Sequence, residues 1–252
     1  MLSFSKIIRL AAKKKLRRKN YMKASGSIIP LPEKRWCGDE FKDDNYYIQS
    51  AEKEANRLIN HFQLMQKHNV LDVGCGQGRL PIGILRVIGE INYIGIDVHL
   101  ESIDWCQRYI QRRHPTFVFK HFNIYNERYN KEGIQIDDKF RFEIASKSID
   151  IIYLYSVFSH TTEEDMRVYL KEFSRILNDQ GKIFLTTFVE EGVDDYSINP
   201  KDYHTYSPSP LHIVRYNKNY LFSTFNEYGF SVLNFTYGSE TAGQSAIYLS
   251  KR

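Results

Sequence analysis

The residues that could carry chemistry begin with the stretch VLDVGCGQGRL at positions 70–80, where an acid precedes three glycines. Asp72 stands two residues before Gly74, and Gly76 and Gly78 follow at alternate positions. An apolar strand that runs into a glycine loop is typical of sites for nucleotide-like cofactors, because glycine lets the backbone approach a ligand closely. A dinucleotide fingerprint would need another glycine at position 79, which is Arg here. The loop therefore indicates a cofactor that is not a dinucleotide.

Polar side chains at the ends of three predicted strands narrow the choice of ligand. The Asp72 carboxylate suits a cationic amine and would repel a pyrophosphate. Asp97 ends the strand NYIGID, where an acid can accept hydrogen bonds from ribose hydroxyls. Asn123 ends the third strand, from which its amide could reach the amino group of a base. A ligand with an amine, a ribose and an adenine in this order is S-adenosylmethionine.

Strand-like and helical patterns alternate along the middle of the chain. The apolar strand-sized runs are 70–73, 92–97, 117–122, 149–155 and 182–188, and the helical patterns are about 51–65, 79–88, 101–113, 163–177 and 217–228. Such alternation predicts a parallel sheet covered by helices on both faces. The last two strand-like runs, 230–238 and 245–250, are joined by a short link, which favours an antiparallel pair. The predicted fold class is α/β: a Rossmann-like, doubly wound, mostly parallel sheet that ends in an antiparallel hairpin.

The charge of the chain is concentrated at its start. Residues 1–23 carry nine Lys and Arg and no acid, so the remainder has 26 basic against 30 acidic residues, a net charge of −4. We expect a basic amphipathic leader over 1–24 and one domain over 25–252, whose first part, 25–44, is irregular. Three interpretations of the leader stay open: a helix lying on an anionic membrane surface, an acid-poor targeting peptide, and a solvated tail.

The lengths of the apolar stretches and the cysteine content indicate where in the cell the protein is expected. No stretch approaches twenty uncharged residues, which excludes a membrane span. The three cysteines, Cys37, Cys75 and Cys106, share no metal-like spacing, and no secretory signal peptide is visible. We therefore expect a reduced, cytoplasmic location, with peripheral contact at the inner membrane face if residues 1–23 bind an anionic surface.

On these motifs the chain resembles class I S-adenosylmethionine-dependent methyltransferases over residues 30–252. The likeness lies in VLDVGCGQGRL, YIGIDVH, FNIYN and the stretch from SIDIIYLY to KIFLTTF. More narrowly, HFNIYNERYN, SVFSHT and GQSAIYLSKR resemble bacterial methyltransferases of the type 11/25-like group that are encoded with glycan-assembly enzymes. The resemblance implies an enzyme that uses S-adenosyl-L-methionine for methylation.

The resemblance also assigns cofactor contacts. It implies that Asp97 binds the ribose, that Val98 packs on the adenine, and that Asn123 and Ile124 contact its amino edge, although the family often has Asp where Asn123 stands. The methionine portion would be held by Asp72 and by the backbone of Gly74, Cys75, Gly76 and Gly78. Two alternatives are a Rossmann-like domain for another cofactor and a binding protein that has lost activity. For Cys75, packing is favoured over a reactive thiol, since no His or Lys stands nearby to activate it.

His160 is the candidate general base. It follows the fourth predicted strand, on the side where the acceptor must lie, and a hydroxyl acceptor needs a base near its proton. The competing interpretation is a histidine that orders the loop before a helix, whose start the run TTEED explains as a capping box.

The connection 190–216 is the expected acceptor-side insertion, because it is rich in aromatic residues with polar tips, which suit a sugar. These residues are Tyr196, Tyr203, His204, Tyr206, His212 and Tyr216. A surface loop pinned by its aromatic side chains explains them equally. Trp36 either closes the pocket from the opposite side or fastens the N-terminal segment to the core.

Together these features predict a metal-independent O-methyltransferase that acts on a hydroxyl of a glycan, a sugar derivative or another small polar acceptor. An RNA acceptor is the first alternative, with the leader as a phosphate-binding arm. The acidic remainder of the chain disfavours nucleic acid as a partner. A non-catalytic S-adenosylmethionine-binding protein is the second alternative.

Overall fold

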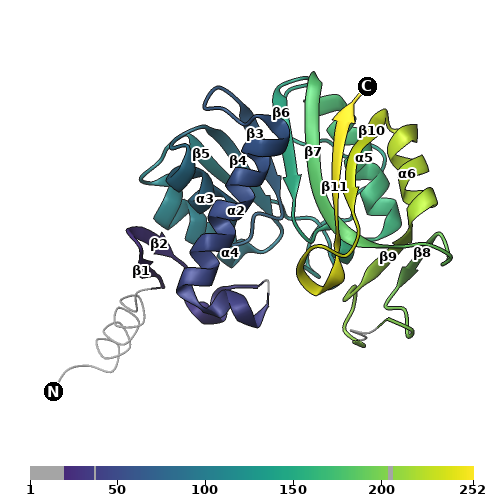
Figure 1. The fold of residues 1–252 in the computed structure, drawn as a ribbon, viewed down its shortest axis with the longest axis horizontal. Helices are drawn as coiled ribbons and strands as arrows, with labels where there is room; N and C mark the ends of the chain where they lie inside the picture. Colours follow the sequence, from purple (N-terminus) through teal and green to yellow (C-terminus); the bar gives the residue numbers. More distant parts are fainter. Residues whose placement is uncertain (1–19, 37, 204–206) are drawn as a thin grey trace.

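The computed structural model describes residues 20–36, 38–203 and 207–252 (Figure 1). Most of the predicted leader, residues 1–19, therefore lies outside the described residues. The end of the predicted leader pairs with the domain, because β1 (Met22–Ala24) and β2 (Ser27–Ile29) form an antiparallel hairpin. Its residues pack on the hydrophobic core, and the Trp105 indole donates to the Asn20 carbonyl at 2.6 Å. The described domain thus begins before the predicted boundary at residue 25.

A twisted sheet with the order β10-β11-β7-β6-β3-β4-β5 forms the centre of the molecule (Figure 1). Its strands are β3 (Asn69–Val73), β4 (Asn92–Asp97), β5 (Phe117–His121), β6 (Ile149–Leu154), β7 (Leu177–Glu190), β10 (Phe230–Thr236) and β11 (Ser245–Lys251). The pairs from β7 to β5 are parallel, whereas β11 is antiparallel to both β7 and β10. The predicted fold class, including the closing hairpin, is confirmed.

Helices cover both faces of this sheet, as the alternating pattern predicts. They are α2 (Asp44–Phe62), α3 (Arg79–Val87), α4 (Leu100–Cys106) with a π-helical continuation (Gln107–Gln111), α5 (Glu163–Ile176) and α6 (Lys218–Glu227). Buried side chains of α2, α3 and α4 share one hydrophobic cluster, and those of α5 and α6 share a second cluster on the opposite face. The strand β6 is buried along almost its whole length, as expected for a parallel strand between two helical layers.

The helix α2 begins earlier than its apolar spacing indicates. The Asp43 side chain accepts a hydrogen bond from the Tyr46 backbone N–H at 2.8 Å and so caps the helix, which ends at Gln63 in a left-handed conformation. A close contact then fixes α2 on α3. A Cβ at Gly83 would stand 1.9 Å from the Ala51 carbonyl oxygen, so only glycine fits there.

Short elements occupy two stretches for which no regular structure is expected. Two 3-10 turns, Pro32–Lys34 and Asp39–Lys42, lie between β2 and α2. In the connection 190–216, β8 (Tyr196–Ile198) pairs with β9 (Val214–Asn217), and β9 extends the sheet beside the end of β7. Elements of three or four residues are too short to show a hydrophobic period, which explains why the sequence pattern misses them.

Candidate active site

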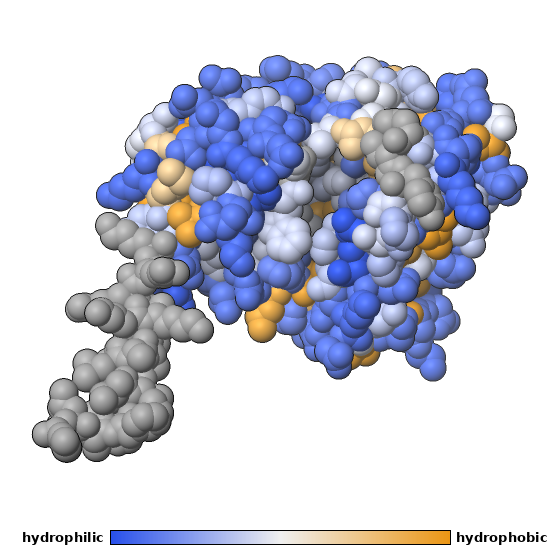
Figure 2. Space-filling model, turned by 90° about the horizontal axis from the view of Figure 1, so that it is seen from below, coloured by the Kyte–Doolittle hydropathy of each residue, from blue (hydrophilic) through white to orange (hydrophobic). Residues whose placement is uncertain are grey.

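A cavity of about 640 Å³ opens where the parallel strands β3, β4 and β6 end. Its walls come from the glycine loop, the end of β4, the segment 122–129, the loop after β6 and the turn before β11. Figure 2 views the molecule from this side, on which hydrophilic residues predominate and hydrophobic ones are scattered. The predicted site residues that line the cavity are Asp72, Gly74, Cys75, Gly76, Asp97, Val98, Ile124 and His160. The structure thus gathers most of the predicted site in one place.

The glycine loop is anchored to β4 and leaves room above it. The backbone N–H groups of Gly74 and Cys75 donate to the Ile96 carbonyl at 2.8 and 3.1 Å. Gly74 has a positive φ of 73°, and a Cβ there would stand 2.6 Å from Val157. Gly76 also has a positive φ, but nothing lies within 4 Å of where its Cβ would be. A ligand can therefore approach the backbone at Gly76.

Gln77 supplies a hydrogen-bond acceptor that has no partner. Its side chain is buried in the cavity wall, and its Oε1 makes no hydrogen bond with the described residues. A buried amide oxygen without a hydrogen bond costs free energy, so we expect a ligand to supply a hydrogen-bond donor to this atom. A cationic amine fits that requirement. Sequence reasoning missed Gln77, because a residue between two loop glycines carries no signal of its own.

Asp72 is a buried carboxyl group whose pKa lies near neutral pH. It accepts a hydrogen bond from the Tyr93 hydroxyl, and both side chains are buried. Burial raises the pKa of Asp72 to about 7, against the opposing effects of the Tyr93 hydrogen bond and the Arg79 charge. An ammonium group placed in the cavity would favour the ionised form. Asp72 is therefore suited to binding a cation from the cavity side.

Asp97 links the glycine loop to the end of β4. Its two carboxylate oxygens accept the backbone N–H groups of Gly76 at 2.7 Å and His99 at 2.8 Å. Burial raises its pKa despite these two hydrogen bonds. Each carboxylate oxygen can accept a second hydrogen bond, so the group stays available to ribose hydroxyls.

Asn123 does not take the predicted position. Its side chain is exposed and outside the cavity, and its Oδ1 accepts a hydrogen bond from Asn130 Nδ2 at 3.0 Å. The cause is a tight loop, in which Ile134 donates to the Asn123 carbonyl at 2.9 Å and Ile124 forms a bridge with Ile134. Ile124 itself lines the cavity beside Val98. The amide of Asn123 thus orders the loop rather than facing the ligand space.

Gly78 and Cys75 are packing residues in the structure. Gly78 precedes α3 in a left-handed conformation, and a Cβ there would stand 2.6 Å from Ile110 Cδ1. The Cys75 thiol is buried, and burial together with Cys106 raises its pKa well above the ordinary value. A protonated thiol is a poor nucleophile. This agrees with the packing interpretation of Cys75.

His160 ends a 3-10 turn, Phe158–His160, directly after β6. Its Nδ1 lies 2.9 Å from the Leu211 carbonyl oxygen, which fixes the proton on Nδ1 and leaves Nε2 as an acceptor. Nε2 lies 3.4 Å from Ser156 Oγ. Burial lowers the pKa of His160 to about 4, and the charge of Arg128 adds to this effect. The imidazole is therefore neutral at pH 7, with a lone pair on Nε2.

The run TTEED does begin a helix, as the structural interpretation of this segment expects. Thr162 caps α5 by accepting a hydrogen bond from the Asp165 N–H at 3.2 Å. His160 takes no part in that cap, so the cap does not explain the orientation of its ring.

The aromatic residues around the cavity are mostly not those expected from 190–216. Tyr216 is fully buried, and Tyr203 packs on Phe188 with ring centroids 5.1 Å apart. His204 and Tyr206 lie outside the described residues, and Tyr196 is on β8 away from the cavity. Of the residues that the structure describes from this set, only His212 lines the cavity.

Trp36 stands at the rim of the cavity instead. Its side chain is 56% exposed, and its ring lies 4.8 Å from that of His99 and 6.1 Å from that of Tyr129. The Tyr129 ring in turn lies 5.8 Å from that of His160. Aromatic edges from the N-terminal segment and from the segment 122–129 thus face the same space as the histidine.

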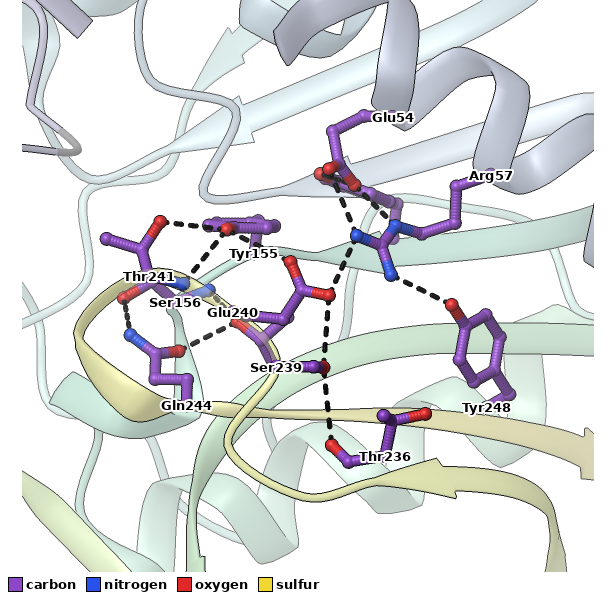
Figure 3. Close-up of polar contacts among 12 residues, drawn as sticks. Glu54, Arg57, Tyr155, Ser156, Thr236, Ser239, Glu240, Thr241, Gln244 and Tyr248 are labelled. Atoms are coloured by element: carbon purple, nitrogen blue, oxygen red, sulfur yellow. Dashed lines mark hydrogen bonds and ion pairs between the residues drawn. The ribbon is translucent and has the colours of Figure 1, made fainter. Parts of the chain in front are cut away.

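The turn between β10 and β11 completes the wall and is held by a buried polar network (Figure 3). Glu240 accepts a hydrogen bond from Arg57 at 2.8 Å and one from the Tyr155 hydroxyl at 3.3 Å. Gln244 donates to Ser156 Oγ at 2.7 Å, next to the loop that carries His160. Residues of α2 and of the last hairpin therefore position the site.

The described residues contain neither a metal-binding cluster nor a membrane-spanning helix. No three His, Cys, Asp or Glu side chains in the described part of the chain gather in a way that could hold a metal ion. Within the same residues, no helix has the length and apolar character needed to cross a bilayer.

Comparison with known proteins identifies the kind of domain. Residues 71–183 match the family model described as a methyltransferase domain. A curated relative, a tRNA (guanine-N(7)-)-methyltransferase of Oceanobacillus iheyensis, is 24% identical over 173 residues, which cover 66% of this chain and 74% of the relative. The family match runs from β3 into β7 and so includes the glycine loop, Asp97 and His160.

Solved structures with a similar fold differ widely in what they do. The 4+2 cyclase SpnF has a TM-score of 0.59 and 16% identity, and the match covers 81% of each chain. A Burkholderia thailandensis 1,6-didemethyltoxoflavin-N1-methyltransferase with bound S-adenosylhomocysteine has a TM-score of 0.55 and 15% identity, over 82% of this chain and 81% of the other. At such identities the likeness concerns the fold, and the acceptor has to be argued from the site.

Proposed function

We propose that this chain, a class I methyltransferase that uses S-adenosyl-L-methionine as methyl donor, methylates a hydroxyl of a glycan or sugar derivative without a metal ion. The proposal concerns the acceptor and the residues that carry the reaction. The observation that supports it most directly is the His160 imidazole, neutral and of fixed tautomer, in the wall of the cavity.

The donor would be held by residues of the glycine loop and of β4. Asp72 and the unpaired Gln77 Oε1 suit its ammonium group, and Asp97 suits its ribose. Val98 and Ile124 would pack on the adenine. When bound, the donor supplies an electrophilic methyl group, which needs an acceptor atom in line with it.

His160 would act as the general base at Nε2. A sugar hydroxyl is a weak nucleophile at neutral pH, so removal of its proton assists the transfer. The Leu211 carbonyl, which accepts a hydrogen bond from the Nδ1–H group, would stabilise the imidazolium that results. The same hydrogen bond keeps Nε2 directed toward the acceptor during turnover.

The surroundings of His160 suit a sugar. Trp36 and Tyr129 offer aromatic surface for the C–H faces of a pyranose ring. The cavity of about 640 Å³ has room for the donor together with a small acceptor.

An acceptor screen with radiolabelled methyl donor tests the proposal. Soluble glycans, sugar nucleotides, lipid extracts and RNA would be offered to the wild type and to Asp97→Ala, which weakens donor binding. We expect label in a sugar fraction, stable to mild base as an ether is. Label confined to RNA, lipid or an ester would overturn the proposal, as would equal labelling by both proteins.

An RNA acceptor is the second candidate, favoured by two observations. The curated relative described above is named as a tRNA methyltransferase, and residues 1–23 carry nine basic side chains. RNA binding through these charges would weaken steeply with salt, whereas a sugar held in the cavity would bind with little salt dependence. Residues 1–19 lie outside the described residues, so this candidate depends on the sequence alone.

We also propose that residues 1–23 contact an anionic membrane surface. Sedimentation with vesicles tests this: the full chain should bind vesicles that contain anionic lipid, and a variant lacking residues 1–19 should not. Equal binding of both proteins would contradict the role of this segment.

A further inference from the structure

Arg128 is a cationic side chain in the cavity wall that pairs with no acidic side chain of the described residues. Its Nε donates to the Tyr129 hydroxyl at 3.0 Å, and its Nη1 makes a long contact of 3.4 Å with the Pro210 carbonyl. Its Nη2 makes no hydrogen bond with the described residues, and none of their carboxylates lies within 4 Å of the guanidinium. Because a guanidinium has five N–H donors, most of its bonding capacity stays available to a ligand.

Several other buried or half-buried arginines of the described chain pair with carboxylates. Arg35 pairs with Asp44, Arg57 with Glu54 and Glu240, Arg175 with Glu172, and Arg215 with Glu190 and Asp202. Arg128, which has no carboxylate of the described residues within 4 Å, stands instead in the wall of the cavity where the proposed acceptor would bind. A partly desolvated cation favours an anion beside it.

Arg128 is also held in register with His160. Asn126 Oδ1 accepts the backbone N–H groups of Arg128 and Tyr129, each at 3.0 Å. The amide of the same Asn126 donates to the His160 carbonyl at 2.9 Å. One side chain thus ties the backbone of the cation to that of the candidate base. The separation of the two groups is set by the fold and not by chance contact of flexible side chains.

Building on the proposed function, we propose that the acceptor is an anionic sugar, whose carboxylate or phosphate binds Arg128 while a neighbouring hydroxyl faces His160. A planar guanidinium can take either group in a two-pronged arrangement. The Tyr129 ring, 5.3 Å from the guanidinium carbon, supports the Arg128 side chain from one side. Arg128 is a specificity-determining residue under this proposal.

An anion at Arg128 would also improve the base. The positive charge of Arg128 contributes to the low pKa of His160 and to that of His212. An acceptor that neutralises this charge would raise the pKa of His160, so that it accepts a proton more readily. A neutral sugar in the same place would leave the base weak. The site would thus select an anionic acceptor in the reaction as well as in binding.

Calorimetry with defined probes tests the proposal without knowledge of the natural acceptor. The protein would be saturated with S-adenosylhomocysteine and titrated with glucuronate, glucose 6-phosphate and methyl glucoside. We expect at least one anionic probe to bind tenfold or more tightly than methyl glucoside. In Arg128→Gln the preference should fall to about twofold, and Arg128→Lys should keep part of it. Which anionic probe binds tells a carboxylate from a phosphate.

Two controls make the outcomes distinct. Arg112→Gln removes the same charge from an exposed position outside this cavity and should leave the preference unchanged. Affinity for S-adenosylhomocysteine should stay the same in Arg128→Gln. If that affinity falls instead and the preference does not, Arg128 binds the donor carboxylate and the proposal is wrong.

The two proposals can fail separately. If binding prefers anionic probes in a way that depends on Arg128, but methyl transfer occurs only to an acid that is not a sugar, the proposed sugar acceptor is wrong. The anion-binding role of Arg128 would then still be supported. Methylation of neutral sugars, with equal binding of all three probes, would support the proposed function and overturn the role of Arg128.

Discussion

His160 Nδ1 lies 2.9 Å from the Leu211 carbonyl oxygen, 51 residues further along the chain. A backbone carbonyl can only accept, so this contact decides which nitrogen of the imidazole carries the proton. Leu211 is buried in the segment before β9, so the 190–216 connection fixes the tautomer of the candidate base that follows β6. The insertion thus contributes to the site mainly through backbone.

The first prediction concerns His160→Gln. Loss of the base should lower kcat by about 10²- to 10⁴-fold, because general base catalysis contributes that much. Affinity for S-adenosylhomocysteine should stay within twofold, since the donor does not depend on Nε2. His114→Gln is the matched control, a half-exposed histidine that pairs with Glu90 and does not line the cavity. An unchanged kcat in His160→Gln would place the base elsewhere.

The second prediction concerns the pH at which His160 takes up a proton. Because its pKa is lowered to about 4, the imidazole should stay neutral from pH 7 down to about pH 5 in the ligand-free protein. The charged groups that face it are Arg128 and His212, both of which oppose protonation. Folding therefore disfavours the protonated ring, and its contribution to stability is lost as pH falls from about 6.5 toward 4.

NMR titration of labelled histidine checks this value, with the His160 signal assigned by its absence from His160→Gln. In Arg128→Gln the midpoint should move upward, since one opposing charge is gone. A midpoint near 6.5 in the wild type would show that the ring is not desolvated and would contradict the prediction.

Asp72→Asn should stabilise the protein and weaken the binding of S-adenosyl-L-methionine. The folded-state pKa of Asp72 is about 7, above the ordinary 3.8, so the unfolded chain releases this proton at lower pH. The favourable contribution of Asp72 is therefore complete below about pH 4 and is lost as pH rises to 7. Asparagine has no proton to release, so it avoids this loss of stability. Its side-chain oxygen can still accept the hydrogen bond from the Tyr93 hydroxyl.

Thermal unfolding without ligand should show a higher Tm for Asp72→Asn at pH 8, with the gain shrinking toward pH 4. Calorimetry at pH 8 should show donor affinity reduced tenfold or more. Asp104→Asn, an exposed change, should alter neither quantity. A lower Tm at pH 8 would indicate that Asp72 is stabilised by contacts that asparagine cannot keep.

The sequence predicts the fold of this molecule, and it predicts that the glycine loop and Asp97 lie together at one end of the sheet. Strand-sized apolar runs and helical spacing locate the sheet, and the glycine loop and Asp97 follow from their place at strand ends. These features depend on local pattern and on one topological rule, that ligands bind beyond the carboxyl ends of parallel strands.

The tertiary contacts of the candidate site could not be predicted in the same way. Arg128 lies in a stretch without hydrophobic period, and its place beside His160 is set by the Asn126 amide across a distance of 34 residues. The unpaired state of Gln77 Oε1 is likewise visible only once its neighbours are known. For Asn123 the prediction was wrong. The residue follows a strand end, as a ligand-binding side chain would, but its side chain hydrogen-bonds with Asn130 in a local turn. Such relationships arise from tertiary contacts that leave no spacing in the sequence.

The last prediction concerns the polar network between α2 and the final hairpin (Figure 3). Arg57 contacts Glu54 at 2.9 Å and Glu240 at 2.8 Å, with all three side chains at least nine-tenths buried. Arg57→Met should lower the free energy of unfolding by about 3–5 kcal/mol, because it leaves two carboxylates without a cation. Glu54→Gln and Glu240→Gln, added to Arg57→Met, should recover much of the loss by removing those charges.

Urea unfolding measures these effects, with Arg86→Met as the matched control. Arg86 pairs with Glu52 at the surface, and such pairs contribute at most about 1 kcal/mol. Because Glu240 precedes the cavity residues Thr241 and Gln244, Arg57→Met should also weaken binding of S-adenosylhomocysteine at temperatures where the protein stays folded. If Arg57→Met and Arg86→Met lose equal stability, the buried network does not hold this turn. The hairpin would then be positioned by strand pairing with β7 alone.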